Sequence, residues 1–177
     1  MTPLSRDFTT PWQGRAVQDV LQSLLLAELV HPSAELWLLS AWITDVEVID
    51  NSARAFAGVR PDWPKSRIRL SSVLEALVGR GGRVAVVLRE VEHNEPFVRR
   101  LKAIQKLSPN RLGLTISASA HEKALIGDDY VLGGSMNITM SGLTHSDEHV
   151  LLRVDPEVAA QRRMALSARW GGQLSWG

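Results

Sequence analysis

Cysteine is absent from this sequence of 177 residues. Disulfide bonds, thiolate metal sites and a cysteine nucleophile are therefore excluded. The sequence also lacks an apolar run approaching the ~18 residues that a membrane-spanning helix needs. Residues 1–14 contain no apolar segment of the kind that a signal peptide has. Together these absences predict a soluble, cytoplasmic protein without a membrane anchor.

A strong net charge is absent as well. The 20 Lys and Arg residues nearly balance the 19 Asp and Glu residues, which leaves a formal net charge of +1. The overall charge therefore predicts no partner, and any affinity for a polyanion has to come from local clusters. Basic residues cluster at 60–69, 99–106 and 162–169. These clusters are candidates for contacts with a nucleic-acid backbone, although 99–106 is more typical of a solvated helix face.

The apolar pattern predicts an α/β fold in one domain that spans residues 1–177. Apolar residues make up 45% of the chain and charged residues 22%, as in an ordinary globular protein. Helical spacing predicts helices over 16–30 and 95–107. Start and stop signals predict helices over 71–78 and from about 156 to 170. Short apolar runs predict buried strands over 35–43, 83–88, 111–117 and 149–154. Helices that alternate with buried strands indicate layers of helices packed on a sheet.

Three stretches are expected to be irregular. These are an N-terminal arm over 1–14, a segment over 51–69 with Gly, Pro and Trp residues, and a short tail over 171–177. A serine is the expected cap of the helix over 71–78.

One stretch in the middle of the chain combines polar pairs with strand-like apolar residues. His121 and Lys123 are two residues apart, and so are Ser135 and Asn137. Side chains at positions i and i+2 of a strand share a face, and turn residues at 127–130 predict that the two runs form a hairpin. The hairpin brings together an imidazole, an ammonium group, a hydroxyl and a carboxamide. Such groups suit a tetrahedral oxyanion.

The same stretch resembles the HxKxxxxD…GSxN motif of the phospholipase D superfamily. The residues on the pattern are His121, Lys123, Asp128, Gly134, Ser135 and Asn137. Five residues separate Asp128 from Gly134, where the commonest version has six, so this hairpin is a short variant. A glutamate that follows the asparagine in the family has its counterpart in Glu148. The resemblance implies a phospholipase D-like lobe, with a mixed β-sheet flanked by helices on both faces.

The resemblance also implies a mechanism. His121 attacks the phosphorus of a phosphodiester and forms a phosphohistidine, while Lys123 and Asn137 hold the phosphoryl oxygens. Glu148 orients the imidazole. Ser135 supports the phosphate or the histidine. Neither a metal nor another cofactor is implied, because the lysines neutralise the charge.

Other motif residues have structural roles, and the motif occurs once. Asp128 and Gly134 are assigned to the turn and the backbone of the hairpin. Many members of the superfamily carry two motifs and form one site between two lobes. A chain with one motif is therefore expected to form a homodimer through its active-site face, with one site around the twofold axis.

Two further groups of residues are candidates for a role at the site. Thr44 and Asp45 follow an apolar run at the strand end where α/β sheets bind ligands, so they are expected to border the cleft, and for Asp45 a capping role is equally compatible. His145 and His149 flank Glu148 at a spacing that a metal site can use, but no carboxylate pattern completes that site. The four histidines other than His121 are therefore interpreted as surface or structural residues: His31, His93, His145 and His149.

The motif by itself leaves more than one class of substrate open. A small chain with one motif is similar to the dimeric bacterial endonucleases of the superfamily. The local sequence HEKALIGDDYVLGGSMNIT is similar to short phospholipase D-like proteins of bacterial genome-defence and DNA-modification clusters. A nuclease acting on DNA or RNA is therefore favoured. The alternatives are a phospholipid or small-diester hydrolase, whose apolar cleft the six tryptophans could line, and a nucleic-acid-binding subunit active only with a partner protein in a defence complex.

Overall fold

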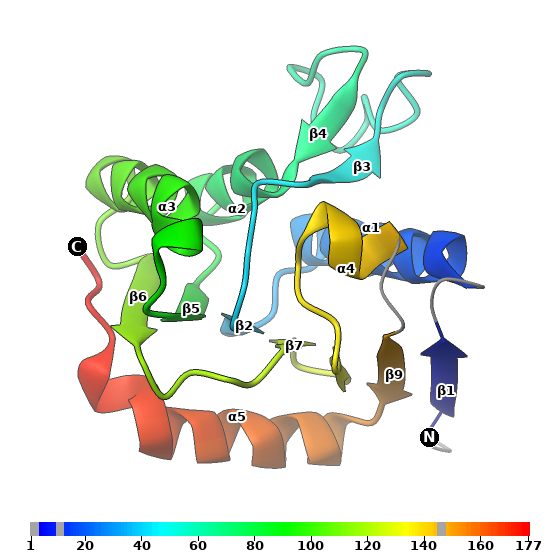
Figure 1. The fold of residues 1–177 in the computed structure, drawn as a ribbon. Coiled ribbons are helices and arrows are strands. Elements are labelled where there is room, and N and C mark those ends of the chain that lie inside the picture. The colour runs from blue at the N-terminus through cyan, green and yellow to red at the C-terminus, as the bar shows by residue number, and fades with distance from the viewer. Residues whose placement is uncertain (1–3, 10–12, 145–147) are drawn as a thin grey trace.

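The computed structural model in Figure 1 describes residues 4–9, 13–144 and 148–177. Within these residues seven strands form the main sheet: β1 (Leu4–Thr9), β2 (Leu36–Ser40), β5 (Val84–Arg89), β6 (Leu112–Ser117), β7 (Ala124–Ile126), β8 (Tyr130–Gly134) and β9 (His149–Val154). Their order across the sheet is β1-β9-β8-β7-β2-β5-β6. Strands β2, β5 and β6 are parallel to one another, and every other pairing is antiparallel. The sheet is therefore mixed, as expected.

Helices cover both faces of this sheet (Figure 1). Helix α5 (Pro156–Trp170) lies across one face and contacts β7 and β8. The opposite face carries α1 (Gly14–Val30), α2 (Leu70–Gly79), α3 (Glu95–Leu107) and the short α4 (Met140–Thr144). Two short 3₁₀ turns, η1 (Glu92–Asn94) and η2 (Gly171–Gln173), precede α3 and follow α5. The expected helices on both faces are thus confirmed.

Burial on both faces explains why the sequence of the central strand β2 is apolar without alternation. All five of its residues are buried. Trp37 and Leu39 belong to the core beneath α5, whereas Leu36 and Leu38 belong to the larger core beneath α1, α2 and α3. Helices cover both faces of this strand, so neither face is exposed to water. Its sequence therefore does not alternate between apolar and polar residues.

The N-terminal arm and the segment 51–69 differ from the expectation. Residues Leu4–Thr9 form strand β1, which pairs with β9 at the side of the sheet, and Phe8 is its one buried residue. Because such a strand is largely solvated, its sequence lacks the apolar run by which buried strands were predicted. Strands β3 (Glu47–Asp50) and β4 (Arg67–Arg69) form a separate two-stranded ribbon around the otherwise irregular segment.

Two details of the predicted helices are also corrected. Helix α2 begins after Arg69, and no side chain of its N-cap residue makes a capping hydrogen bond, so the expected serine cap is wrong. Leu107 shares the helical spacing of the apolar residues Phe97, Leu101 and Ile104, which predicts a buried position, but it is 74% exposed at the end of α3. The start of α5 is as predicted, because Asp155 accepts hydrogen bonds from the N–H groups of Glu157 and Val158.

Candidate active site

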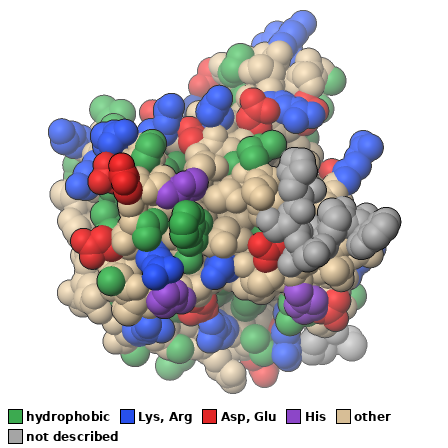
Figure 2. Space-filling view, viewed as in Figure 1, with side chains coloured by type: hydrophobic (Ala, Val, Ile, Leu, Met, Phe, Trp, Pro, Cys, Tyr) green, Lys and Arg blue, Asp and Glu red, His purple; other side chains and the backbone are tan. Residues whose placement is uncertain are grey.

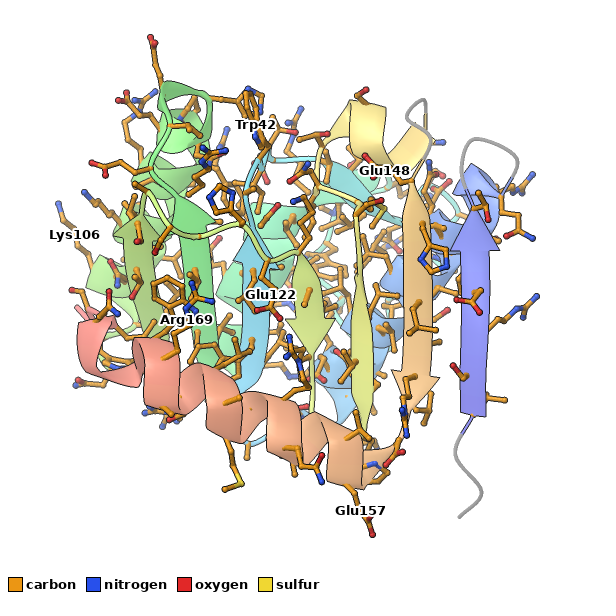
Figure 3. All side chains as sticks on the ribbon, turned by 60° about the horizontal axis from the view of Figure 1, so that its bottom comes forward. Trp42, Lys106, Glu122, Glu148, Glu157 and Arg169 are labelled. Carbon is orange, nitrogen blue, oxygen red and sulfur yellow. The ribbon has the colours of Figure 1, made fainter. Side chains whose placement is uncertain are left out.

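Several chain segments meet at one end of the sheet, the end at which the parallel strands β2, β5 and β6 finish. The register pairs Leu39 of β2 with Ala124, the first residue of β7, and pairs Ala124 with Gly133 near the end of β8. Gly134 in turn lies opposite Val150 near the start of β9. The chain just before β7, just after β8 and just before β9 is therefore brought to this carboxyl end of the sheet. Figure 3 shows Trp42 and Glu148 at this end and Glu157 at the other.

His121 and Lys123 lie immediately before β7 instead of within it. The His121 side chain is exposed, and the Lys123 side chain is half-buried. The Lys123 Nζ donates a hydrogen bond to the backbone carbonyl of His121 at 2.9 Å. Lys123 also borders a small cavity of about 20 Å³ that apolar side chains line, with Met136 and Ile138 among them. The lysine thus packs its stem against the core while its charged end stays beside His121.

Ser135 connects the end of β8 to Glu148. Its hydroxyl donates a hydrogen bond to the Glu148 carboxylate and accepts one from the backbone N–H of His149 at 3.0 Å. The Ser135 N–H donates to the carbonyl of His149, also at 3.0 Å. The serine therefore holds this carboxylate at the carboxyl end of the sheet, although the two residues are 13 positions apart in the chain.

Asn137 joins the motif to the turn after β2. Its Oδ1 accepts a hydrogen bond from the backbone N–H of Trp42 at 3.0 Å. This bond assigns the carboxamide oxygen to Trp42 and leaves the Nδ2 group as the donor that faces elsewhere. Asn137 and Glu148 border the same pocket of about 540 Å³. Its lining is completed by Trp42, Thr44, His93, Thr139 and the first residues of α4.

The two residues expected at the border of the cleft lie in different surroundings. Thr44 lines the pocket beside Asn137. The Asp45 carboxylate instead accepts hydrogen bonds from the N–H and the hydroxyl of Ser71, at 2.9 and 2.8 Å, and forms an ion pair with Arg100 at 3.2 Å. Asp45 therefore supplies the acceptor at the start of α2 that the cap residue itself does not.

Asp128 lies at the opposite end of the hairpin, in the turn between β7 and β8. Its carboxylate accepts the N–H of Ala34 at 2.9 Å and pairs with Arg163 of α5. The Asp128 N–H donates to the Ser33 hydroxyl at 2.8 Å. These contacts tie the turn to the chain before β2 and to α5, away from the other motif residues.

Sequence reasoning missed three residues around the pocket. Trp42 and His93 border it, and their rings are 5.2 Å apart with an interplanar angle of 53°. Asn94 is buried, and its carboxamide accepts the N–H of Ile43 and donates to the carbonyls of Ala41 and Arg89, each at 2.9 Å. Nothing in the local spacing marks these residues, because the hydrogen bonds that join the turn at Trp42 to Asn94 and Asn137 span 51 to 95 positions of the chain.

A metal site finds no support among the residues that the structure describes. Within them, no three His, Asp or Glu side chains gather where they could hold an ion. His145, one of the two histidines weighed for a metal, lies outside the described residues. The other, His149, pairs with Asp7 of β1 at 3.1 Å.

No described helix is long and apolar enough to cross a membrane.

The basic clusters are largely engaged by acidic groups or backbone. Figure 2 shows acidic and basic side chains next to one another over the projecting β3–β4 ribbon. The ion pairs include Arg60–Asp62, Arg67–Glu47, Arg67–Asp50, Arg99–Glu95, Arg100–Asp45, Arg162–Glu122 and Arg163–Asp128. A pocket of about 740 Å³ between α1 and this ribbon has charges of both signs, and none of its lining residues belongs to the motif. The pocket at Asn137, which Asn137 and Glu148 border although His121 and Lys123 do not line it, is therefore the better candidate for the site.

Comparison with protein families matches residues 45–170 to the family described as "Cardiolipin synthase, PLD-like domain". The match includes every motif residue and Glu148. Comparison with curated proteins finds no match.

Similar folds occur among solved structures. NucT from Helicobacter pylori has 16% sequence identity and a TM-score of 0.64, with 99% of both chains covered. Nuc from Salmonella typhimurium, a phospholipase D family member, has 18% identity and a TM-score of 0.60, with 98% of this chain and 97% of that chain covered. Phosphatidylserine synthase from Haemophilus influenzae has 11% identity and a TM-score of 0.64, but this chain covers 40% of it. At these identities the likeness concerns the fold.

Proposed function

The chain belongs to the phospholipase D-like family, and from this premise we propose that it is a metal-independent phosphodiesterase that cleaves nucleic acid through a phosphohistidine. One observation supports the proposal most. The register of β7, β8 and β9 gathers the chain at 121–123, 135–137 and 148 at one end of the sheet. These are the segments that carry the imidazole, the ammonium group, the carboxamide and the carboxylate of the motif.

In the proposed reaction an imidazole nitrogen of His121 attacks phosphorus, and the bond to the leaving oxygen breaks. His121 of the partner subunit donates a proton to that oxygen. The same group then takes a proton from water, which attacks the phosphohistidine and releases the phosphate product from His121. Imidazole suits both roles because its pKa ordinarily lies near neutral pH.

The other motif residues stabilise charge in this scheme. The Lys123 ammonium and the Asn137 Nδ2 donate to the phosphoryl oxygens as negative charge develops, a contribution of about 2.7–4 kcal/mol for a well-placed donor. Because the Asn137 Oδ1 is bonded to the Trp42 N–H, its donor end is set for this contact. Glu148, which Ser135 holds, orients the imidazole and stabilises the imidazolium.

The positions of the tryptophans favour nucleic acid over lipid as the substrate. Of the tryptophans that could line an apolar cleft, Trp37, Trp63 and Trp170 are buried in the core. Trp12 lies outside the described residues, and of the described tryptophans Trp42 alone borders the pocket at Asn137.

The test is cleavage of single- and double-stranded DNA and RNA in EDTA at low salt. We expect the wild-type protein to cleave at least one of them, and His121→Ala to lower the rate by more than about a thousandfold. His31→Ala is the matched control, because His31 is an exposed histidine at the end of α1 and should leave the rate unchanged. If the wild-type protein cleaves none of these nucleic acids, the proposal of a nuclease that acts without a partner is wrong. The next experiments would then test phospholipid diesters as substrates and a partner protein as a requirement for activity.

A further inference from the structure

Trp42 is the exposed aromatic residue of the candidate site. It is 44% exposed, whereas Trp37, Trp63 and Trp170 are at most 7% exposed. Its ring lies next to that of His93 at the pocket that Asn137 and Glu148 border. A large aromatic side chain left in water beside a set of polar motif residues is typical of a surface that binds a flat ligand.

The backbone that carries Trp42 is held on both sides. Its N–H donates to the Asn137 Oδ1 at 3.0 Å, and its carbonyl accepts the Ser40 hydroxyl at 2.6 Å. The neighbours Ala41 and Ile43 are both hydrogen-bonded to the buried Asn94 side chain. Exposure of the indole is therefore a property of a fixed turn, and a ligand that stacks on it meets a surface that is already ordered.

The chemistry of the pocket indicates what stacks there. Its lining combines the Trp42 ring with the hydroxyl-bearing Thr44 and Thr139 and the Glu148 carboxylate. The exposed Met140 adds apolar surface to this lining, so polar groups and apolar surface lie side by side in the pocket. A nucleobase has an apolar face to stack and a polar edge for hydrogen bonds. In a nucleic acid it is also attached, through its sugar, to the phosphodiester that the neighbouring motif residues would bind.

We propose that Trp42 is a stacking platform for an unpaired nucleobase next to the scissile phosphate. This inference rests on the proposed nuclease function and adds a specificity determinant to it. A base inside a duplex has both faces covered by its neighbours and cannot stack on Trp42 without leaving the helix. The site therefore selects single-stranded or locally unpaired nucleic acid.

The test measures binding in the His121→Ala background, where no cleavage occurs. The ligands are a short oligothymidylate and an abasic deoxyribose-phosphate oligomer of the same length. We expect Trp42→Ala to weaken oligothymidylate binding by roughly 5- to 150-fold and Trp42→Phe to keep most of the affinity. The abasic oligomer should bind all three proteins equally. Leu107→Ala is the matched control, since Leu107 is exposed on α3 and should change neither affinity.

The possible failures are distinguishable. If Trp42→Ala weakens the abasic oligomer as much as oligothymidylate, the residue acts on pocket shape or subunit contact and the platform is overturned. If it weakens neither while the wild-type protein still cleaves nucleic acid, the platform fails and the nuclease stands. If the wild-type protein neither binds nor cleaves nucleic acid, the proposed function fails and the inference fails with it. Sedimentation of each variant shows whether its assembly matches the wild type.

Discussion

Asn137 shows how one residue of the motif reaches beyond it. Its carboxamide oxygen is bonded to the turn after β2, and the turn on its other side is held by Asn94, which no motif contains. We therefore expect a substitution at either asparagine to change the position of Trp42. Mutants of Asn137 with lowered activity should be interpreted with this contact in view.

Gly134 allows a comparison of two adjacent glycines in β8. Its φ is +145°, and a Cβ there would overlap the carbonyl oxygen of His149. We expect Gly134→Ala to lower the free energy of unfolding by at least about 1–3 kcal/mol. Gly133→Ala is the control, since a Cβ on Gly133 would have its closest neighbour at 3.5 Å. Chemical denaturation of both variants measures the difference, and equal stabilities would show that β9 gives way at little cost.

At the scale of elements, the β7–β8 hairpin is anchored at its turn as well as at the site. The buried Glu28 of α1 accepts hydrogen bonds from the Tyr130 hydroxyl at 3.1 Å and from the Ser33 hydroxyl at 2.7 Å. Burial, with the nearby Glu28 carboxylate, raises the pKa of the Tyr130 phenol well above its ordinary value. The phenol therefore stays a neutral donor, and this network fixes the hairpin relative to α1.

Helix α5 is expected to make stability depend on pH through its first residues. A hydrogen bond from Arg153, together with those from the backbone at Val158 and Glu157, lowers the pKa of Asp155 below its ordinary value of 3.8. A carboxyl with a lowered pKa in the folded state adds stability above its unfolded pKa and loses that contribution as pH falls through the folded pKa. We expect Asp155→Asn to lower the melting temperature at neutral pH.

The difference between wild type and Asp155→Asn should shrink as the pH falls below 3.8 and through the lowered pKa of Asp155. Thermal unfolding across this range is the measurement. A difference that stays constant with pH would mean that the carboxylate charge contributes nothing beyond the hydrogen bonds an asparagine can also make.

At the scale of the whole molecule, one motif per chain makes the proposed site depend on two subunits. If His121 of each subunit is needed, a mixed dimer of wild type and His121→Ala is inactive. When the two proteins are refolded together in equal amounts, about one quarter of the dimers should contain two intact subunits. The cleavage rate should therefore be about one quarter of that of a wild-type sample with the same total protein concentration. Activity at about one half would instead show that each subunit works alone. Sedimentation should give a mass twice that of one chain.

The sequence by itself determined much of the architecture and the identity of the motif. Helices α1 and α3 and strands β2, β5, β6 and β9 lie where apolar patterns predicted them, because the burial of each element sets the pattern of apolar residues along it. Helix α5 begins where its acidic and proline start signals predicted. The hairpin of β7 and β8 followed from turn residues between two apolar runs. Family membership followed from the order of a few polar residues, now matched over 45–170.

Only the tertiary structure decided how distant segments meet. The pairing of β1 with β9, the support of α2 by Asp45 and the clamp of Asn94 on the turn at Trp42 join residues far apart in the chain. No local pattern encodes such contacts, because each depends on which strands become neighbours and in what register. Trp42 illustrates the point. In sequence it extends a buried apolar run, whereas in the structure the strand ends at Ser40 and the next turn leaves the indole in solvent.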